Sequence, residues 1–140
     1  VSERDRRRAD MAEGTFGTAV NCMDGRVQAP VTEWVRANFP VQYVDAITEA
    51  GPDGILAKGE PRELIESIRA RVLVSVNAHH SGVIVVAGHA GCAGNPVARE
   101  RHIADVLQAM RLIAGWGLPV RVVGLYVGET GSVEVVTPEG

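Results

Sequence analysis

The chain has 140 residues, of which 46% are hydrophobic and 22% charged, and its formal net charge is −3. This length holds one domain with a substantial core but not two, and the composition is that of a globular protein, not a disordered one. Because Lys58 is the only lysine and the net charge is slightly negative, we expect neither a nucleic-acid partner nor an anionic membrane partner.

Residues 1–14 are dominated by charged side chains, so they lack the apolar stretch of a secretory signal. No apolar run in the chain approaches the ~20 residues that cross a bilayer. We therefore expect a cytoplasmic protein, with an N-terminal arm or extension at 1–14 and a single domain at 15–140. In that reducing compartment the two cysteines are more often thiols or metal ligands than a disulfide.

Hydrophobic periodicity in the first half of the chain predicts strands that alternate with helices. A β-rich run at 15–22 is followed by a helix at 28–38, and Pro30 suits the start of this helix. A second strand is predicted at 41–48. Residues 51–54, Gly-Pro-Asp-Gly, have the chemistry of a loop.

The second half of the chain continues the same alternation. A helix is predicted at 61–77, a buried β-branched strand at 83–87 and a third helix at 96–114. Two last strands, at 120–127 and 132–137, are joined by a tight Gly-Glu-Thr-Gly hairpin. The alternation indicates an α/β fold with a mostly parallel sheet of about five strands covered by helices. We expect the strand order 2-1-3-4, with an antiparallel edge strand.

Both cysteines and one of the four histidines fall in two short clusters, Cys-Met-Asp-Gly-Arg at 22–26 and His-Ala-Gly-Cys at 89–92. Each cluster follows a predicted strand. Ligands collect where parallel strands end and the strand order reverses, so the order 2-1-3-4 brings the two clusters together. Cys22, His89 and Cys92 then offer three ligands to one Zn²⁺ ion. A fourth position stays open for water, as in catalytic zinc sites.

These two motifs, Cys-x-Asp-x-Arg and His-x-x-Cys, are similar to the signature of the β-class carbonic anhydrases. Ala50-Gly51 lies where that family has an Ala-Gly loop, and residues 124–131 resemble its terminal hairpin. The resemblance covers residues 15–137 and identifies the chain as a short member of the family.

The resemblance implies a carbonate dehydratase, a zinc lyase that converts carbon dioxide to bicarbonate through a zinc-bound hydroxide. Cys22, His89 and Cys92 would be the zinc ligands. Asp24 would accept a hydrogen bond from the hydroxide and orient it, and Arg26 would hold Asp24 away from the metal. The resemblance also implies a homodimer or a larger homo-oligomer, with carbon dioxide and bicarbonate as its small-molecule partners.

Two other functions remain open on the sequence. A carbon disulfide or carbonyl sulfide hydrolase uses the same scaffold and ligands, and a zinc-binding protein without turnover would serve regulation or assembly. The chain also departs from the family pattern at Glu49, where a basic or amide side chain is usual, and at Ala93, where glycine is usual.

The other histidines lie outside the two motifs. His79 and His80 precede the strand that leads to His89, so we expect them at the opposite edge of the sheet, exposed at a helix end. His102 lies in the helix after the second motif. It is interpreted either as a proton shuttle or as a residue of the outer face of that helix.

Overall fold

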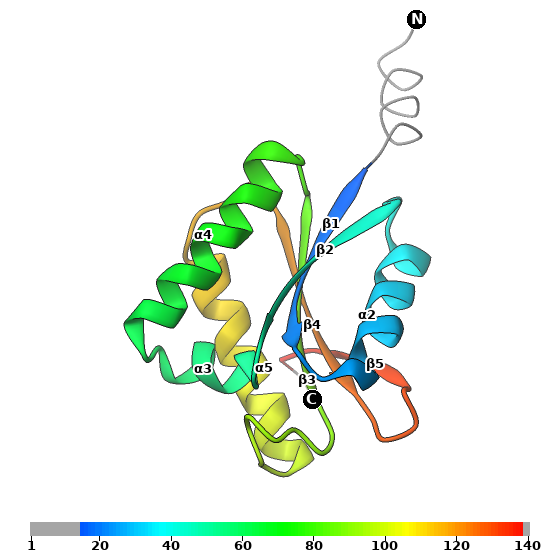
Figure 1. Cartoon of the computed structure of the whole chain (residues 1–140), viewed down its shortest axis with the longest axis vertical. Coiled ribbons are helices and arrows are strands. Elements are labelled where there is room, and N and C mark those ends of the chain that lie inside the picture. Colours follow the sequence, from blue (N-terminus) through cyan, green and yellow to red (C-terminus); the bar gives the residue numbers. More distant parts are fainter. Residues whose placement is uncertain (1–14, 139–140) are drawn as a thin grey trace, which may run out of the picture.

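The computed structural model describes residues 15–138 (Figure 1). The predicted N-terminal arm at 1–14 and the last two residues of the chain lie outside the described residues. Within them, five strands form one sheet in the order β2-β1-β3-β4-β5. The strands are β1 (Phe16–Cys22), β2 (Tyr43–Glu49), β3 (Val83–His89), β4 (Arg121–Val127) and β5 (Val133–Val136).

The sheet confirms the predicted fold class and strand order. Strand β1 pairs in parallel with both β2 and β3, and β3 pairs in parallel with β4. Strand β5 runs antiparallel to β4 at the edge of the sheet. The strand order reverses between β1 and β3, so the residues that follow these two strands meet at one switch point.

Helices cover both faces of the sheet. The described helices are α2 (Gly25–Asn38), α3 (Pro52–Lys58), α4 (Arg62–Ala78) and α5 (Arg99–Ala114). Helix α2 lies against one face, and α3, α4 and α5 lie against the other (Figure 1).

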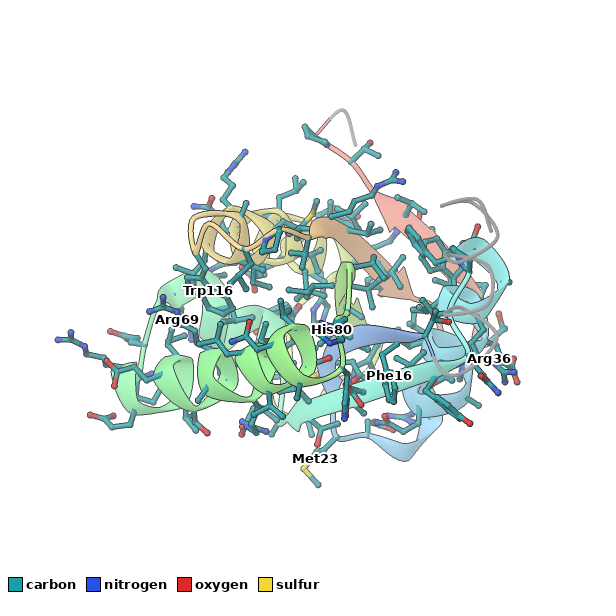
Figure 2. All side chains as sticks on the ribbon, turned by 90° about the horizontal axis from the view of Figure 1, so that it is seen from above. Phe16, Met23, Arg36, Arg69, His80 and Trp116 are labelled. Carbon is teal, nitrogen blue, oxygen red and sulfur yellow. The ribbon has the colours of Figure 1, made fainter. Side chains whose placement is uncertain are left out.

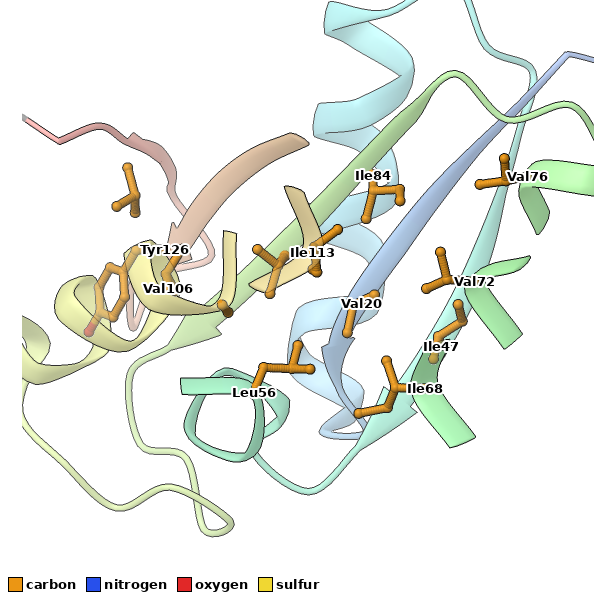
Figure 3. Close-up of a cluster of buried hydrophobic side chains, with 13 residues drawn as sticks. Val20, Ile47, Leu56, Ile68, Val72, Val76, Ile84, Val106, Ile113 and Tyr126 are labelled. Atoms are coloured by element: carbon orange, nitrogen blue, oxygen red, sulfur yellow. The ribbon is translucent and has the colours of Figure 1, made fainter. Parts of the chain in front are cut away.

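Alternate residues along a strand point to opposite faces of a sheet, and two apolar cores result here. Val20 and Ile84 pack with the side chains of α4 and α5 (Figure 3). Ala19 and Val85 pack with the side chains of α2 instead. Both faces of β1 and β3 are therefore buried, which holds the ends of these strands in fixed positions.

The prediction of a loop at 51–54 is wrong, because helix α3 begins at Pro52. Its N-cap, Gly51, has a left-handed φ of 68°. Glycine and proline favour turns, but the same pair also starts a helix, since proline lacks an N–H that the first turn would leave unpaired. At seven residues the helix is too short for periodicity to reveal. It carries Asp53 into the interior, where the residue is 1% exposed.

The predicted start of the first helix is also wrong, because α2 begins at Gly25 rather than at residue 28. Asp24 is its N-cap, since the Asp24 carboxylate accepts the backbone N–H of Arg26 at 2.9 Å. Pro30 therefore lies inside the helix and not at its start. Asp24, a predicted catalytic residue, is thus also the N-cap of the helix that follows it.

The described surface carries a few exposed large hydrophobic side chains, namely Met23, Tyr43, Val74 and Val135. Met23 is 65% exposed, and Figure 2 shows it projecting away from the ribbon. Scattered apolar side chains of this kind are ordinary on a protein surface. Among residues 15–138, no helix combines the length and apolar character needed to cross a membrane.

Candidate metal centre

Three potential metal ligands converge where β1 and β3 end. Cys22 is the last residue of β1, His89 is the last residue of β3, and Cys92 lies in the loop that follows. All three side chains are buried, and their ligand atoms lie within 4.8 Å of one another. The fold thus brings together residues that are up to 70 positions apart in the sequence, as the strand order predicted.

The spacing of the two sulfur atoms fits a tetrahedral zinc ion. Cys22 Sγ and Cys92 Sγ lie 3.8 Å apart, and both residues are free cysteines. Two sulfurs that each lie ~2.3 Å from one tetrahedral ion are separated by about 3.8 Å. The pair therefore has the separation that a shared zinc ion requires.

The His89 side chain presents one nitrogen with no partner. His89 Nδ1 lies 2.8 Å from the carbonyl oxygen of Ala90. Because a carbonyl only accepts hydrogen bonds, the ring donates from Nδ1 and its lone pair is on Nε2. This Nε2 is buried and has no hydrogen-bond partner among the described residues. Buried polar atoms are nearly always paired, and a metal ion would account for this one.

The surroundings of Cys92 favour a bound cation over a free thiolate. Burial raises the pKa of Cys92 to about 11, and the nearby Cys22 adds to the increase. The backbone N–H groups of Gly94 and Asn95 donate to the Cys92 sulfur and act in the opposite direction. A divalent cation would neutralise two adjacent thiolates, so a donor set of two sulfurs and one imidazole fits Zn²⁺.

Asp24 and Arg26 form a bidentate ion pair, held by hydrogen bonds to both carboxylate oxygens, beside the three candidate ligands. Arg26 Nη2 donates to Asp24 Oδ2 at 2.6 Å, and Arg26 Nε donates to Asp24 Oδ1 at 3.0 Å. These side-chain hydrogen bonds are the main reason that the pKa of Asp24 lies well below its usual range. Arg26 Nη2 also donates to the carbonyl of Gly91 at 3.2 Å. Arg26 therefore connects the loop after β1 with the loop after β3.

A cavity of about 240 Å³ lies beside these groups. It is lined by His89 and Arg26, and by Glu129 and Gly131 from the hairpin between β4 and β5. Pockets for drug-sized ligands usually span ~300–1,000 Å³. A smaller cavity next to three potential metal ligands has room for a molecule of a few atoms.

Gln28, which no sequence pattern indicated, holds the loop after β1 through its side-chain amide. Gln28 Nε2 donates to the carbonyl oxygens of Cys22 and Asp24, at 2.7 and 2.8 Å. Its Oε1 accepts a hydrogen bond from Asn21 Nδ2 at 3.1 Å. Gln28 lies one helical turn after the Asp24 N-cap, a spacing at which side chains reach back to the helix start. Because the helix was predicted to begin at residue 28, the spacing between Gln28 and the helix start was not recognised.

The acidic side chain that departs from the family pattern is neutralised within the fold. The Glu49 carboxylate accepts a hydrogen bond from the guanidinium of Arg71 in α4. The backbone carbonyl of Glu49 accepts the N–H of Met23 at 2.8 Å. Glu49 thus joins the end of β2 to the loop after β1 rather than adding an unpaired charge near the ligands.

The other histidines divide between the surface and the core. His79 and His80 are exposed at the end of α4, as predicted, and His79 Nδ1 lies 2.7 Å from Asp45 Oδ2. The prediction that His102 lies on an outer face is wrong. Its side chain is fully buried, with Nδ1 2.7 Å from Asp53 Oδ2. Asp53 belongs to α3, the helix that the sequence analysis missed.

Comparison with known proteins gives a family match and a fold match. The model of a family described as "Putative carbonic anhydrase" matches residues 12–137. Among solved structures, the chain is similar to the carbonic anhydrase of Streptococcus mutans, at 18% identity, 98% coverage of this chain, 99% coverage of that chain and a TM-score of 0.58. It is also similar to the carbonic anhydrase of Glaciozyma antarctica, at 14% identity, 97% and 96% coverage and a TM-score of 0.56.

A third similar structure comes from work on two tetrameric β-carbonic anhydrases of Sordaria macrospora. The identity is 14%, the match covers 96% of this chain and 87% of that chain, and the TM-score is 0.50. At these identities the likeness establishes a shared fold and not a shared activity. No curated protein sequence matches the chain significantly.

Proposed function

The chain belongs to the carbonic anhydrase family and has the β-class fold, and from this premise we propose that it catalyses the reversible hydration of carbon dioxide to bicarbonate. The supporting observation is the buried set of Cys22, His89 and Cys92, next to a cavity of a size for a small substrate. Three protein ligands leave one position of a tetrahedral zinc ion for water. Bound zinc lowers the pKa of that water to about 7 and so supplies a nucleophile at neutral pH.

Each side chain around the ligands has a proposed role. Cys22 and Cys92 supply negative charge, and His89 presents Nε2 because its Nδ1 is engaged with a backbone carbonyl. The ionised Asp24 accepts a hydrogen bond from the reacting water and orients it. Arg26 occupies both oxygens of Asp24 and so keeps this carboxylate from becoming a fourth ligand.

We also propose that the protein is a cytoplasmic homodimer or larger homo-oligomer. The similar Sordaria enzymes are described as tetrameric. A reducing cytoplasm would keep the two free cysteines available as ligands. Sedimentation velocity tests the assembly, and a monomer at every concentration would contradict it.

Metal content and turnover test the proposed activity. Zinc-loaded protein should hold about one zinc per chain and accelerate carbon dioxide hydration in a stopped-flow assay. Consumption of carbonyl sulfide and carbon disulfide should be measured beside it. Hydrolysis of either without hydration of carbon dioxide would favour the hydrolase alternative. Bound zinc without turnover would indicate a regulatory or assembly protein, and an absence of zinc would contradict the site itself.

The Asp24–Arg26 pair should persist across the neutral pH range. The hydrogen bonds from Arg26 lower the pKa of Asp24 from its usual value of about 3.9. A carboxyl group with a lowered folded-state pKa is ionised above its usual pKa and loses its pairing only as the pH falls through the lowered value. The ¹³C NMR shift of the Asp24 carboxyl carbon should therefore stay flat from about pH 9 to about pH 5.

The Arg26→Ala variant provides the comparison for this measurement. In metal-free Arg26→Ala protein, the Asp24 carboxyl carbon should titrate at a higher pH than in the unmodified protein but below the usual value of about 3.9, because the backbone N–H of residue 26 still donates to it. A midpoint at or above that value in the unmodified protein would contradict the pairing and the constant ionisation that the proposed role of Asp24 requires.

A further inference from the structure

A network of buried polar side chains lies next to the loop that carries Cys92. None of these side chains is one of the three candidate metal ligands. Asn95 is 7% exposed, and its side-chain Nδ2 donates to Asp53 Oδ1 at 3.2 Å and to Asp105 Oδ2 at 3.0 Å. Asp53 is 1% exposed and Asp105 is 6% exposed. Both hydrogens of one amide are thus shared between two buried carboxylates, which belong to α3 and α5.

Each carboxylate has a second hydrogen-bonding partner. Asp53 Oδ2 lies 2.7 Å from Nδ1 of the fully buried His102. Asp105 Oδ1 accepts a hydrogen bond from Arg101 Nε at 3.0 Å. The carboxylates are therefore held from several sides, and neither can follow Asn95 if its amide moves.

The backbone around Asn95 is packed as closely as its side chain. A Cβ atom on Gly54 of α3 would lie 2.8 Å from Asn95 Cγ. A Cβ atom on Gly94 would lie 2.3 Å from the carbonyl carbon of Ala50. Contacts below 3 Å are not tolerated by real Cβ atoms, so the Cys92 loop lies directly on α3 and on the loop that precedes it.

This network reaches Cys92 through the backbone of one short loop. Asn95 lies three residues after Cys92, between β3 and α5. The side chain that the two carboxylates hold and the Cys92 sulfur therefore belong to the same loop segment. Fixing the amide restricts where the sulfur lies relative to the other two candidate ligand atoms.

We propose that Asn95 is a positioning residue that fixes Cys92 for the metal. The inference rests on the proposed zinc function and assigns a role to a residue outside the candidate ligand set and outside the lining of the cavity beside it. Without the Asn95 amide, the loop loses its connection to α3 and α5, and the Cys92 sulfur is no longer fixed in place. The thiolate should then hold the ion less firmly while the other two ligands keep their places.

The test is the rate at which the holoprotein releases its metal to a chelator, together with the near-ultraviolet thiolate band of the cobalt-substituted protein. Asn95→Ala should release zinc at least ~10-fold faster than the unmodified protein and should weaken or shift the thiolate band, since loss of a supporting partner typically costs 10–100-fold in metal affinity. Asp105→Asn, which keeps the shape of the side chain, should also accelerate release, by a smaller factor.

Val76→Ala is the matched control for general destabilisation. Val76 is a buried core residue of α4, so its truncation should lower the unfolding temperature but leave the release rate within about twofold and the thiolate band unchanged. Release from Asn95→Ala at the Val76→Ala rate would overturn the inference while leaving the zinc site intact. If Asn95→Ala does not fold, Asp105→Asn decides, and release at the unmodified rate would overturn the proposal. An unmodified protein without zinc would contradict the proposed function as well.

Discussion

Cys92→Ser and His89→Ala should each lose zinc and nearly all carbon dioxide hydration. Both side chains are buried, and their ligand atoms form a set of three with Cys22. Removing one leaves two protein ligands, too few for a stable zinc site. We expect zinc to fall from about one per chain to below ~0.1 after dialysis, and the stopped-flow trace to match the buffer alone.

The same variants should also be less stable than the zinc-loaded protein. An ion that binds only the folded chain stabilises that chain. The gain grows with the ratio of the free zinc concentration to the dissociation constant of the site, and it is ~2.7 kcal/mol at a ratio of 100. Metal-free unmodified protein should therefore melt close to Cys92→Ser, which changes a single buried atom. His89→Ala should melt lower still, because it also leaves a cavity.

His80→Asn is the control for these substitutions. His80 is exposed and has a positive φ of 57°, which asparagine tolerates better than most residues. It should keep both zinc and turnover. Full zinc content in Cys92→Ser or in His89→Ala would contradict the ligand set, whatever the activity of the variant.

The parts of the fold that follow from hydrophobic periodicity were predicted well. Strand β3 begins with four β-branched residues and is buried along its whole length. The long helices α4 and α5 bury apolar stripes against the sheet, although α5 begins at Arg99 and not at residue 96 as predicted. Helix α3 was missed because seven residues give no usable period, and because glycine and proline, here Gly51 and Pro52, occur both in turns and at helix starts.

The convergence of Cys22, His89 and Cys92 was predictable because few residue types bind zinc, and because strand order decides whether the two motifs meet. The supporting residues were not. Gln28 and Asn95 act through side-chain amides, which occur anywhere in a sequence and have no spacing of their own. The partners of Gln28 lie around the start of α2, and one of the two partners of Asn95 lies in α3. Both roles therefore depend on features that periodicity did not place.

Arg26→Ala should keep zinc but lower the rate of carbon dioxide hydration by about 100-fold, at the upper end of what loss of a supporting partner costs. The substitution retains the backbone N–H that Asp24 accepts at 2.9 Å, so the start of α2 should survive. It removes the side-chain hydrogen bonds to Asp24 and the contact with the Gly91 carbonyl. The carboxylate is then free to turn toward the metal position and occupy the place of water.

Arg36→Ala and Arg26→Lys complete the series. Arg36 lies in the last turn of α2 and is exposed, so its loss should leave the rate unchanged. Lysine carries the charge but cannot form two parallel hydrogen bonds with one carboxylate, so Arg26→Lys should fall between the two alanine variants. The spectrum of the cobalt-substituted Arg26→Ala protein should report an added carboxylate ligand. If zinc-loaded Arg26→Ala hydrates carbon dioxide at the unmodified rate, Arg26 does not hold Asp24 for the reaction, and the pair serves only to start the helix.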